Sequence, residues 1–202
     1  MDLPDWPPPS RECCWYLHPD GGLGPGPAPE AVTQFRYDPA DPTPTVGGRL
    51  LLSGQSGYRE DTALAERPDV LGFTSAPLDS ALLVCGTPVL ELDHGNDGGH
   101  FDVFGRISEV DRRGRSRNVS DGYRRFSAAP EGTIRLELDP IAHRFSPGSR
   151  LRVLIAGGSH PRFARNLGTG EPVVSGRRMV PSTHRVRHGE SSRLILPVAE
   201  SV

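Results

Sequence analysis

The sequence predicts an all-β protein: an antiparallel jelly-roll β-sandwich with few helices. Gly and Pro contribute 24 and 21 of the 202 residues, which is typical of a chain rich in turns and poor in helices. The apolar residues form short runs that alternate with polar ones, the two-residue period of half-buried strands. About nine such runs, separated by Gly- and Pro-rich turns, favour a sandwich.

Residues 1–48 are expected to wrap around the sandwich as part of the same unit, and residues 49–202 to form the jelly-roll domain itself. The run Trp6-Pro7-Pro8-Pro9 opens the wrap, and proline at such density is not found in central strands. Aromatic residues nevertheless recur there, so short strands are expected at 14–17 and 34–37.

The middle of the chain is expected to supply most of the strands. A short apolar segment bounded by glycines lies at 45–57, and residues 58–69 leave room for one helical turn before Pro68. A loop is expected at 94–100, and a turn at Asp121-Gly122 between two short strands. The strands expected here are 70–73, 82–93 with a break at 86–88, 101–110, 117–119, 123–126 and 133–139.

The strand at 150–156 is expected to be a core strand that leads into a long polar loop. Leu151, Val153 and Ile155 alternate with arginines, so they should point into the core. Gly157 and Gly158 then end the strand. Further along, 183–188 and 193–196 are predicted to close the chain as a hairpin.

Four residues of the polar loop, Arg162, Phe163, Arg165 and Asn166, are the candidate site residues, and we interpret them as structural. Phe163 is apolar within a polar loop and should be buried beneath it. At least one of the two arginines should be buried and hydrogen-bonded, because a guanidinium group satisfies several acceptors at once. If both arginines and Phe163 were exposed, the loop would instead be a binding surface.

No catalytic residue, cofactor site or metal site is predicted. The segments 54–58 and 157–161 come nearest to Gly-x-Ser-x-Gly, but both lack the last glycine and neither leads into a helix. Ser159 and His160 are consecutive, so on a strand end their side chains should point apart.

Histidines and acidic residues give only weak metal patterns. His184 and His188 would lie ~13 Å apart on a strand, too far to bind one ion. The loop containing Asp93, Asn96 and Asp97 resembles a calcium loop only loosely, because Gly95 occupies a ligand position.

Charge and cysteine content argue against several classes of protein. The net charge is −2, whereas a nucleic-acid-binding domain usually has a basic excess, so no nucleic-acid partner is expected. No apolar run reaches the ~20 residues of a membrane span, so no membrane association is expected. Three cysteines without a spaced framework, and no signal-peptide pattern at the N-terminus, lead us to expect a cytoplasmic protein.

Many short motifs, in order along nearly the whole chain, make it resemble the C-terminal domain of the cocaine-esterase/X-Pro dipeptidyl-peptidase (CocE/NonD) family of serine hydrolases. The matching pieces are Trp6-Pro7-Pro8-Pro9, Trp15-Tyr16-Leu17, Asp20-Gly21, Phe35-x-Tyr37-Asp38-Pro39, Pro44-Thr45-Val46-Gly47-Gly48, Arg67-Pro68-Asp69-Val70-Leu71-x-Phe73-Thr74-Ser75, Pro77-Leu78, Val110-Asp111-x-x-Gly114-x-Ser116, Asp121-Gly122, Pro147-Gly148-x-Arg150-Leu151-Arg152, His160-Pro161-Arg162-Phe163-x-Arg165-Asn166, Thr169-Gly170-Glu171-Pro172 and Leu196-Pro197-Val198. The chain departs from the family at 84–88 and 98–102.

The resemblance implies a jelly-roll domain of the galactose-binding-domain-like kind. In the family this domain follows an α/β-hydrolase domain, which holds the catalytic Ser, Asp and His. None of these three is present here, so the chain alone is expected to be inactive. Its expected partner is an α/β-hydrolase domain or subunit, against which it packs to help wall the substrate cleft; homo-oligomerisation is also open. The alternative is a free-standing jelly-roll module that binds a ligand such as a carbohydrate.

Overall fold

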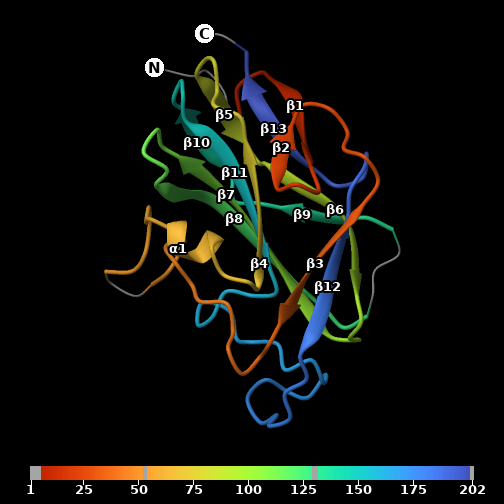
Figure 1. Cartoon of the computed structure of the whole chain (residues 1–202). Coiled ribbons are helices and arrows are strands. Elements are labelled where there is room, and N and C mark those ends of the chain that lie inside the picture. The colour runs from red at the N-terminus through yellow and green to blue at the C-terminus, as the bar shows by residue number, and fades with distance from the viewer. Residues whose placement is uncertain (1–5, 52–53, 129–131, 201–202) are drawn as a thin grey trace.

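The structure, a computed structural model, describes residues 6–51, 54–128 and 132–200, and it is built almost entirely of strands (Figure 1). One short helix interrupts them. In chain order the elements are β1 (Ser10–Leu17), β2 (Gly22–Gly24), β3 (Val32–Tyr37), α1 (Thr62–Ala65), β4 (Val70–Ser75), β5 (Leu82–Gly86), β6 (Val89–Asn96), β7 (Phe101–Val110), β8 (Ser116–Phe126), β9 (Ile134–Glu137), β10 (Ile141–Phe145), β11 (Arg150–Ala156), β12 (Ser182–Arg187) and β13 (Arg193–Ala199).

The strands form an all-β sandwich, which confirms the predicted fold class. One layer runs β4-β11-β7-β8, and the other contains β3-β12-β6-β13 with β9 paired to β6. β1 and β2 link the layers, because β1 pairs with β13 and β2 pairs with β4. The β2–β4 pairing is parallel and the other pairings between the described strands are antiparallel, so the sheet is mixed.

The main core lies between the two layers, and alternation along the strands fills it. On β11, Leu151, Val153 and Ile155 are at most 1% exposed and belong to this core, as predicted. They face apolar residues of β6 and β13 such as Leu90 and Leu196. Leu154 and Ala156 of the same strand point to the opposite face.

A second, smaller core covers the outer face of the β4-β11-β7-β8 layer. Leu64 of α1 packs there with residues of β4, β7 and β11, and Phe163 contributes from the loop after β11. The helical turn predicted before Pro68 is therefore present as α1, and it places the preceding loop over this face.

Two predictions of local structure are wrong. Asp121 and Gly122 do not form a turn: β8 runs through them, and Gly122 pairs with Gly105 of β7. A Cβ atom at Gly122 would lie 2.5 Å from the carbonyl oxygen of Glu137, so this glycine allows a close approach of two chain segments.

The C-terminal hairpin is also wrong, because β12 and β13 do not pair with each other. β12 lies between β3 and β6, and β13 pairs with β1, β5 and β6, so β6 separates the two strands. Sequence reasoning also missed β2 and β10, and β6 extends to Asn96 into the expected loop.

The N-terminal segment contributes two strands to the layer that contains β12 and β13. β1 pairs with β13 from Ser10 to Tyr16, and β3 pairs with β12 from Val32 to Tyr37. Among the described residues, no helix has the length and apolar character to cross a bilayer.

Candidate functional site

The outer face of the β7–β8 pair carries a row of polar residues, and they form the candidate site. Residues of β7 alternate strictly: Phe101, Val103 and Ile107 enter the main core, whereas Asp102 and Arg106 point to the other face. A register shift between Ile107 and Ser108 accommodates one extra residue on β8. Such a bulge changes which residues share a face, and here it brings Asn118 to the same side as Asp121.

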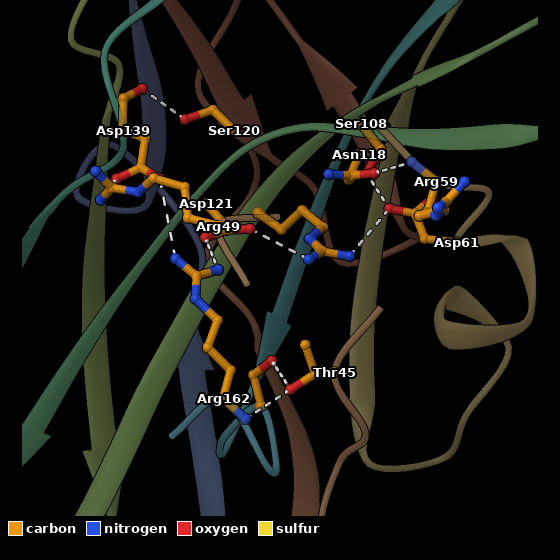
Figure 2. Close-up of polar contacts among 12 residues, drawn as sticks. Thr45, Arg49, Arg59, Asp61, Ser108, Asn118, Ser120, Asp121, Asp139 and Arg162 are labelled. Atoms are coloured by element: carbon orange, nitrogen blue, oxygen red, sulfur yellow. Dashed lines mark hydrogen bonds and ion pairs between the residues drawn. The ribbon is translucent and has the colours of Figure 1, made fainter. Parts of the chain in front are cut away.

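Arg106 lies at the centre of a buried ionic network. Its side chain is fully buried, and its Nη2 donates to Oδ2 of Asp121 at 3.2 Å (Figure 2). Its Nη1 lies 3.5 Å from Oδ2 of Asp61, the residue that precedes α1. The same Asp61 oxygen accepts a hydrogen bond from Ser108 at 2.7 Å. Arg106 therefore bridges the helical segment and β8 from beneath.

Arg162 joins the loop after β11 to this network. Its side chain is 10% exposed, and its Nη1 donates to Oδ1 of Asp121 at 2.5 Å. Its backbone N–H donates to the hydroxyl of Thr45 at 3.2 Å, and that hydroxyl lies 3.0 Å from Oγ of Ser159. Asp121 therefore receives one guanidinium group on each carboxylate oxygen, and both hydrogen bonds are strengthened because donor and acceptor are charged.

Asp139 and Arg49 extend the network to the surface. Asp139 pairs with Arg49, whose side chain is 74% exposed, and its Oδ2 lies 3.9 Å from Nη2 of Arg162. Burial raises the pKa of the Asp139 carboxyl group. The network thus contains the charges of Asp61, Asp121 and Asp139 against those of Arg49, Arg106 and Arg162, so it is electrically balanced.

The network also contacts Gly48 and Gly57. These two glycines exchange backbone hydrogen bonds of 2.9 and 2.8 Å, which close the base of the loop. Asn118 of β8 adds a hydrogen bond from Nδ2 to the carbonyl of Gly57 at 3.1 Å. Gly48 has a φ of +81°, and a Cβ atom there would lie 2.7 Å from Asp121 Oδ2, so only glycine fits without strain.

A second polar cluster lies further along the same strands, around Asp102. This carboxylate is 2% exposed and accepts hydrogen bonds from Tyr123 at 2.7 Å, from Arg125 at 2.8 Å and from Asn166 at 2.7 Å. Burial, together with the nearby charge of Asp102, raises the pKa of Tyr123. The cluster anchors the end of the 162–166 loop to β7 and β8.

The structure places the four predicted loop residues in or beside these two clusters. Arg162 belongs to the ionic network and Asn166 to the Asp102 cluster, and Arg165 donates to the carbonyl of Pro39 at 3.3 Å. Phe163 is not buried beneath the loop as expected. It is half-buried and stacks on Tyr123, with ring centroids 3.9 Å apart.

None of the rejected catalytic patterns comes together in the structure. Ser159 is 3% exposed, and its hydroxyl contacts Thr45 rather than an imidazole. His184 forms a hydrogen bond with His94 at 3.0 Å, whereas His188 is bound to the carbonyl of Leu17 at 2.8 Å. Over residues 6–51, 54–128 and 132–200 there is no group of three or more His, Cys, Asp or Glu residues suited to a metal ion.

Sequence reasoning missed the centre of the site. Asp61, Arg106, Asp121 and Asp139 are far apart in the sequence, and only Arg106 gave a signal. It interrupts the apolar run of β7, from Phe101 to Val110, in which nearly every other residue is buried. A charge inside such a run predicts either an edge or a buried ion pair, and the structure shows the second.

Comparison with known proteins gives a match over nearly the whole chain. Residues 1–195 match the family described as the X-Pro dipeptidyl-peptidase C-terminal non-catalytic domain. The chain is 28% identical over 186 residues to the cocaine esterase of Rhodococcus sp., covering 84% of this chain and 32% of the esterase. It is 29% identical over 228 residues to a putative serine esterase of Mycobacterium bovis, covering 96% of this chain and 35% of that protein.

Solved structures give the same fold. The chain superimposes on an aminopeptidase from a marine sediment Thaumarchaeota archaeon with a TM-score of 0.84 at 24% identity, covering 99% of this chain and 38% of the aminopeptidase. An α-amino acid ester hydrolase gives a TM-score of 0.79 at 23% identity, covering 93% of this chain and 36% of the hydrolase. The chain thus spans about a third of the length of the proteins it matches, and it belongs to the family of X-Pro dipeptidyl-peptidase C-terminal non-catalytic domains.

Proposed function

We propose that this domain packs on an α/β-hydrolase domain or subunit and helps to wall its substrate cleft. The observation that carries the proposal is the family match over residues 1–195, combined with relatives named as esterases of which the chain spans only 32–35%. The two thirds of each relative that this chain lacks leave room for a hydrolase domain.

The ionic network supports this role because it holds the 162–166 loop and the glycine pair Gly48 and Gly57 at one side of the sandwich. Leu51, which follows Gly48, is fully exposed, and Tyr58, which follows Gly57, is 51% exposed. Side chains on a backbone that is already anchored lose less conformational entropy when they lie against another domain.

The alternative of a free-standing sugar-binding module needs aromatic side chains gathered on one exposed face. Among the described residues, the exposed large aromatics are Trp6 and Tyr58. Tyr58 lines a hollow with the arginines of the β7–β8 turn, and Trp6 does not line it. This arrangement favours the accessory-domain role.

The proposal also covers the strand connectivity, the cellular location and the oligomeric state of the protein. We infer jelly-roll connectivity of the galactose-binding-domain-like kind, a cytoplasmic location and the possibility of self-association. The motif resemblance and the cysteine content support these points.

Co-expression tests the central proposal. The DNA on either side of this coding sequence is searched for a reading frame that encodes an α/β-hydrolase. The encoded hydrolase is then produced with and without this chain. We expect the two proteins to co-purify, and the hydrolase to lose most of its ester-cleaving activity when the chain is left out. Absence of a hydrolase frame, or full activity of the hydrolase without the chain, would overturn the proposal.

A further inference from the structure

The segment between β11 and β12 contains a compact loop whose apolar residues face solvent. Half of the exposed large apolar side chains among the described residues lie in it: Val173 (41%), Val174 (100%), Met179 (39%) and Val180 (40%), out of eight. We call residues 168–181 the β11–β12 loop. It projects from the end of the sandwich opposite the two termini (Figure 1).

The loop is closed at its base by tight backbone contacts. The N–H of Val180 donates to the carbonyl of Leu167 at 2.9 Å. Gly168 has a φ of +73°, and a Cβ atom there would lie 2.2 Å from the carbonyl oxygen of Val180. Only glycine permits this crossing of the two chain segments. The two ends of the loop therefore meet.

The interior of the loop is hydrogen-bonded to itself. The carboxylate of Glu171 accepts the N–H of Arg177 at 3.0 Å, and the carbonyl of Pro172 accepts the N–H of Gly176 at 2.7 Å. Gly176 packs against Leu167, because a Cβ atom there would lie 2.5 Å from Leu167 Cδ1. The Glu171 carboxylate thus bonds to the loop's own backbone, and the apolar side chains are left exposed.

The loop is hydrogen-bonded to itself but leaves its apolar tip exposed, and this combination indicates a docking element. A loop that only connects two strands gains nothing from exposed valines, whereas exposed apolar groups on an ordered loop mark contact surfaces. Arg177 and Arg178 lie between the apolar residues, and within the described part of the chain neither forms an ion pair. The matching surface is therefore apolar at its centre with acidic residues at its rim.

We propose that the β11–β12 loop inserts its tip, Val173 and Val174, into an apolar pocket with an acidic rim on the partner hydrolase. This inference rests on the proposed function and names the surface through which it operates. The tip is a contact separate from the loop between Gly48 and Gly57, because it lies at the far end of the sandwich beyond β3 and β12.

Limited trypsin digestion tests the proposal, since the loop offers the cleavage sites Arg177 and Arg178 beside its tip. The co-purified complex and the chain alone are digested, and cleavage at these two sites is measured relative to cleavage at Arg113 in the β7–β8 turn. We expect the complex to lower this ratio at least tenfold. An unchanged ratio in a stable complex would overturn the loop assignment while leaving the proposed function intact. Failure of the complex to form would overturn both.

Two substitutions sharpen the test. Val174→Asp should weaken binding of the co-expressed hydrolase at least about tenfold, because a charge cannot enter an apolar pocket without loss of affinity. Val32→Asp is the matched control, since Val32 is 54% exposed on β3 and lies outside the loop. Both variants should keep the wild-type Tm.

Equal binding by Val174→Asp and wild type would contradict the proposal. So would protection of Arg177 and Arg178 that grows with the concentration of the isolated chain, because it would assign the tip to self-association.

Discussion

Asp121 is the residue on which the candidate site depends most. Its carboxylate accepts hydrogen bonds from Arg106 of β7 and from Arg162 of the loop after β11, and its side chain is 3% exposed. Taking such charges out of water costs several kcal/mol per ion, and the pairing offsets that cost only while all partners remain. The network therefore adds more to the uniqueness of the structure than to its net stability.

Replacing Asp121 by alanine should destabilise the domain strongly. The change leaves Arg106 buried with only Asp61 at 3.5 Å, and breaking a buried ion pair costs ~3–5 kcal/mol. Urea unfolding followed by circular dichroism measures the loss. Asp111→Ala is the control, because Asp111 lies in the exposed β7–β8 turn and the loss of its ion pair with Arg115 should cost much less. Equal losses in the two variants would show that the network has no structural role.

The His94–His184 pair should make the domain sensitive to mild acid. Burial lowers the pKa of His94 to about 4 and that of His184 to about 3, from an ordinary 6.5. Between pH 6.5 and about 4 only the unfolded state binds these protons. The free energy of unfolding should therefore fall with decreasing pH, by up to ~1.4 kcal/mol per pH unit for each histidine.

The double variant His94→Gln/His184→Gln tests this prediction. The measured quantity is the slope of the free energy of unfolding against pH, so the variant need not be as stable as the wild type. We expect a clearly flatter slope between pH 4 and 6.5, and an unchanged slope for the control His100→Gln. A wild-type slope in the double variant would contradict the assignment.

Individual strands show what the sequence can and cannot predict about this fold. β11 was predicted correctly because its alternation of Leu151, Val153 and Ile155 with arginines is a local signal. β8 was predicted as two strands, because Asp-Gly is typical of a turn. In the structure β8 continues through both residues. Arg106 and Arg162 bind the Asp121 carboxylate, and Gly122 has no Cβ atom, so the segment at Glu137 can pack closely against it. These contacts are non-local, so no local pattern reveals them.

Non-local contacts also explain why the sequence did not predict the ionic network, although it did indicate the loop residues. Arg162 and Asn166 belong to a conspicuous polar loop that follows a core strand, so the sequence marks them. Asp61, Asp121 and Asp139 occur in ordinary turn-like contexts. The register of β7 against β8 places Asp121 opposite Arg106, whereas Asp61 and Asp139 reach the network from the segments before α1 and after β9.

The glycine at position 122 gives a test at the scale of one element. Gly122→Ala places a Cβ atom 2.5 Å from a carbonyl oxygen, and forcing such overpacking costs ~1–3 kcal/mol. Gly95→Ala on β6 is the matched control, because a Cβ atom there meets nothing within 4 Å. Thermal unfolding should give a lower Tm for the first variant and no loss for the second. A Tm for Gly122→Ala as high as that of the control would mean that the two segments are not closely packed.

At the scale of the whole molecule, we expect the N-terminal segment and the sandwich to fold as one unit. β1 and β3 supply pairing partners to β13 and β12, and Phe35 and Tyr37 of β3 belong to the main core. A chain that begins at residue 49 loses both strands and exposes the edges of β12 and β13. We expect this truncated chain to be unfolded or aggregated by circular dichroism and size-exclusion chromatography; a cooperative thermal transition near that of the full chain would show that the segment is dispensable.

The central claim is that this domain serves a hydrolase without being one, and ester hydrolysis by the purified full chain tests it most directly. The chain is assayed with p-nitrophenyl esters and X-Pro p-nitroanilides, alongside Ser159→Ala. Because Ser159 is 3% exposed and contacts Thr45 rather than a base, we predict turnover at the level of the buffer for both proteins. Turnover by the wild type that Ser159→Ala abolishes would contradict the account, because it would place a working nucleophile in this domain.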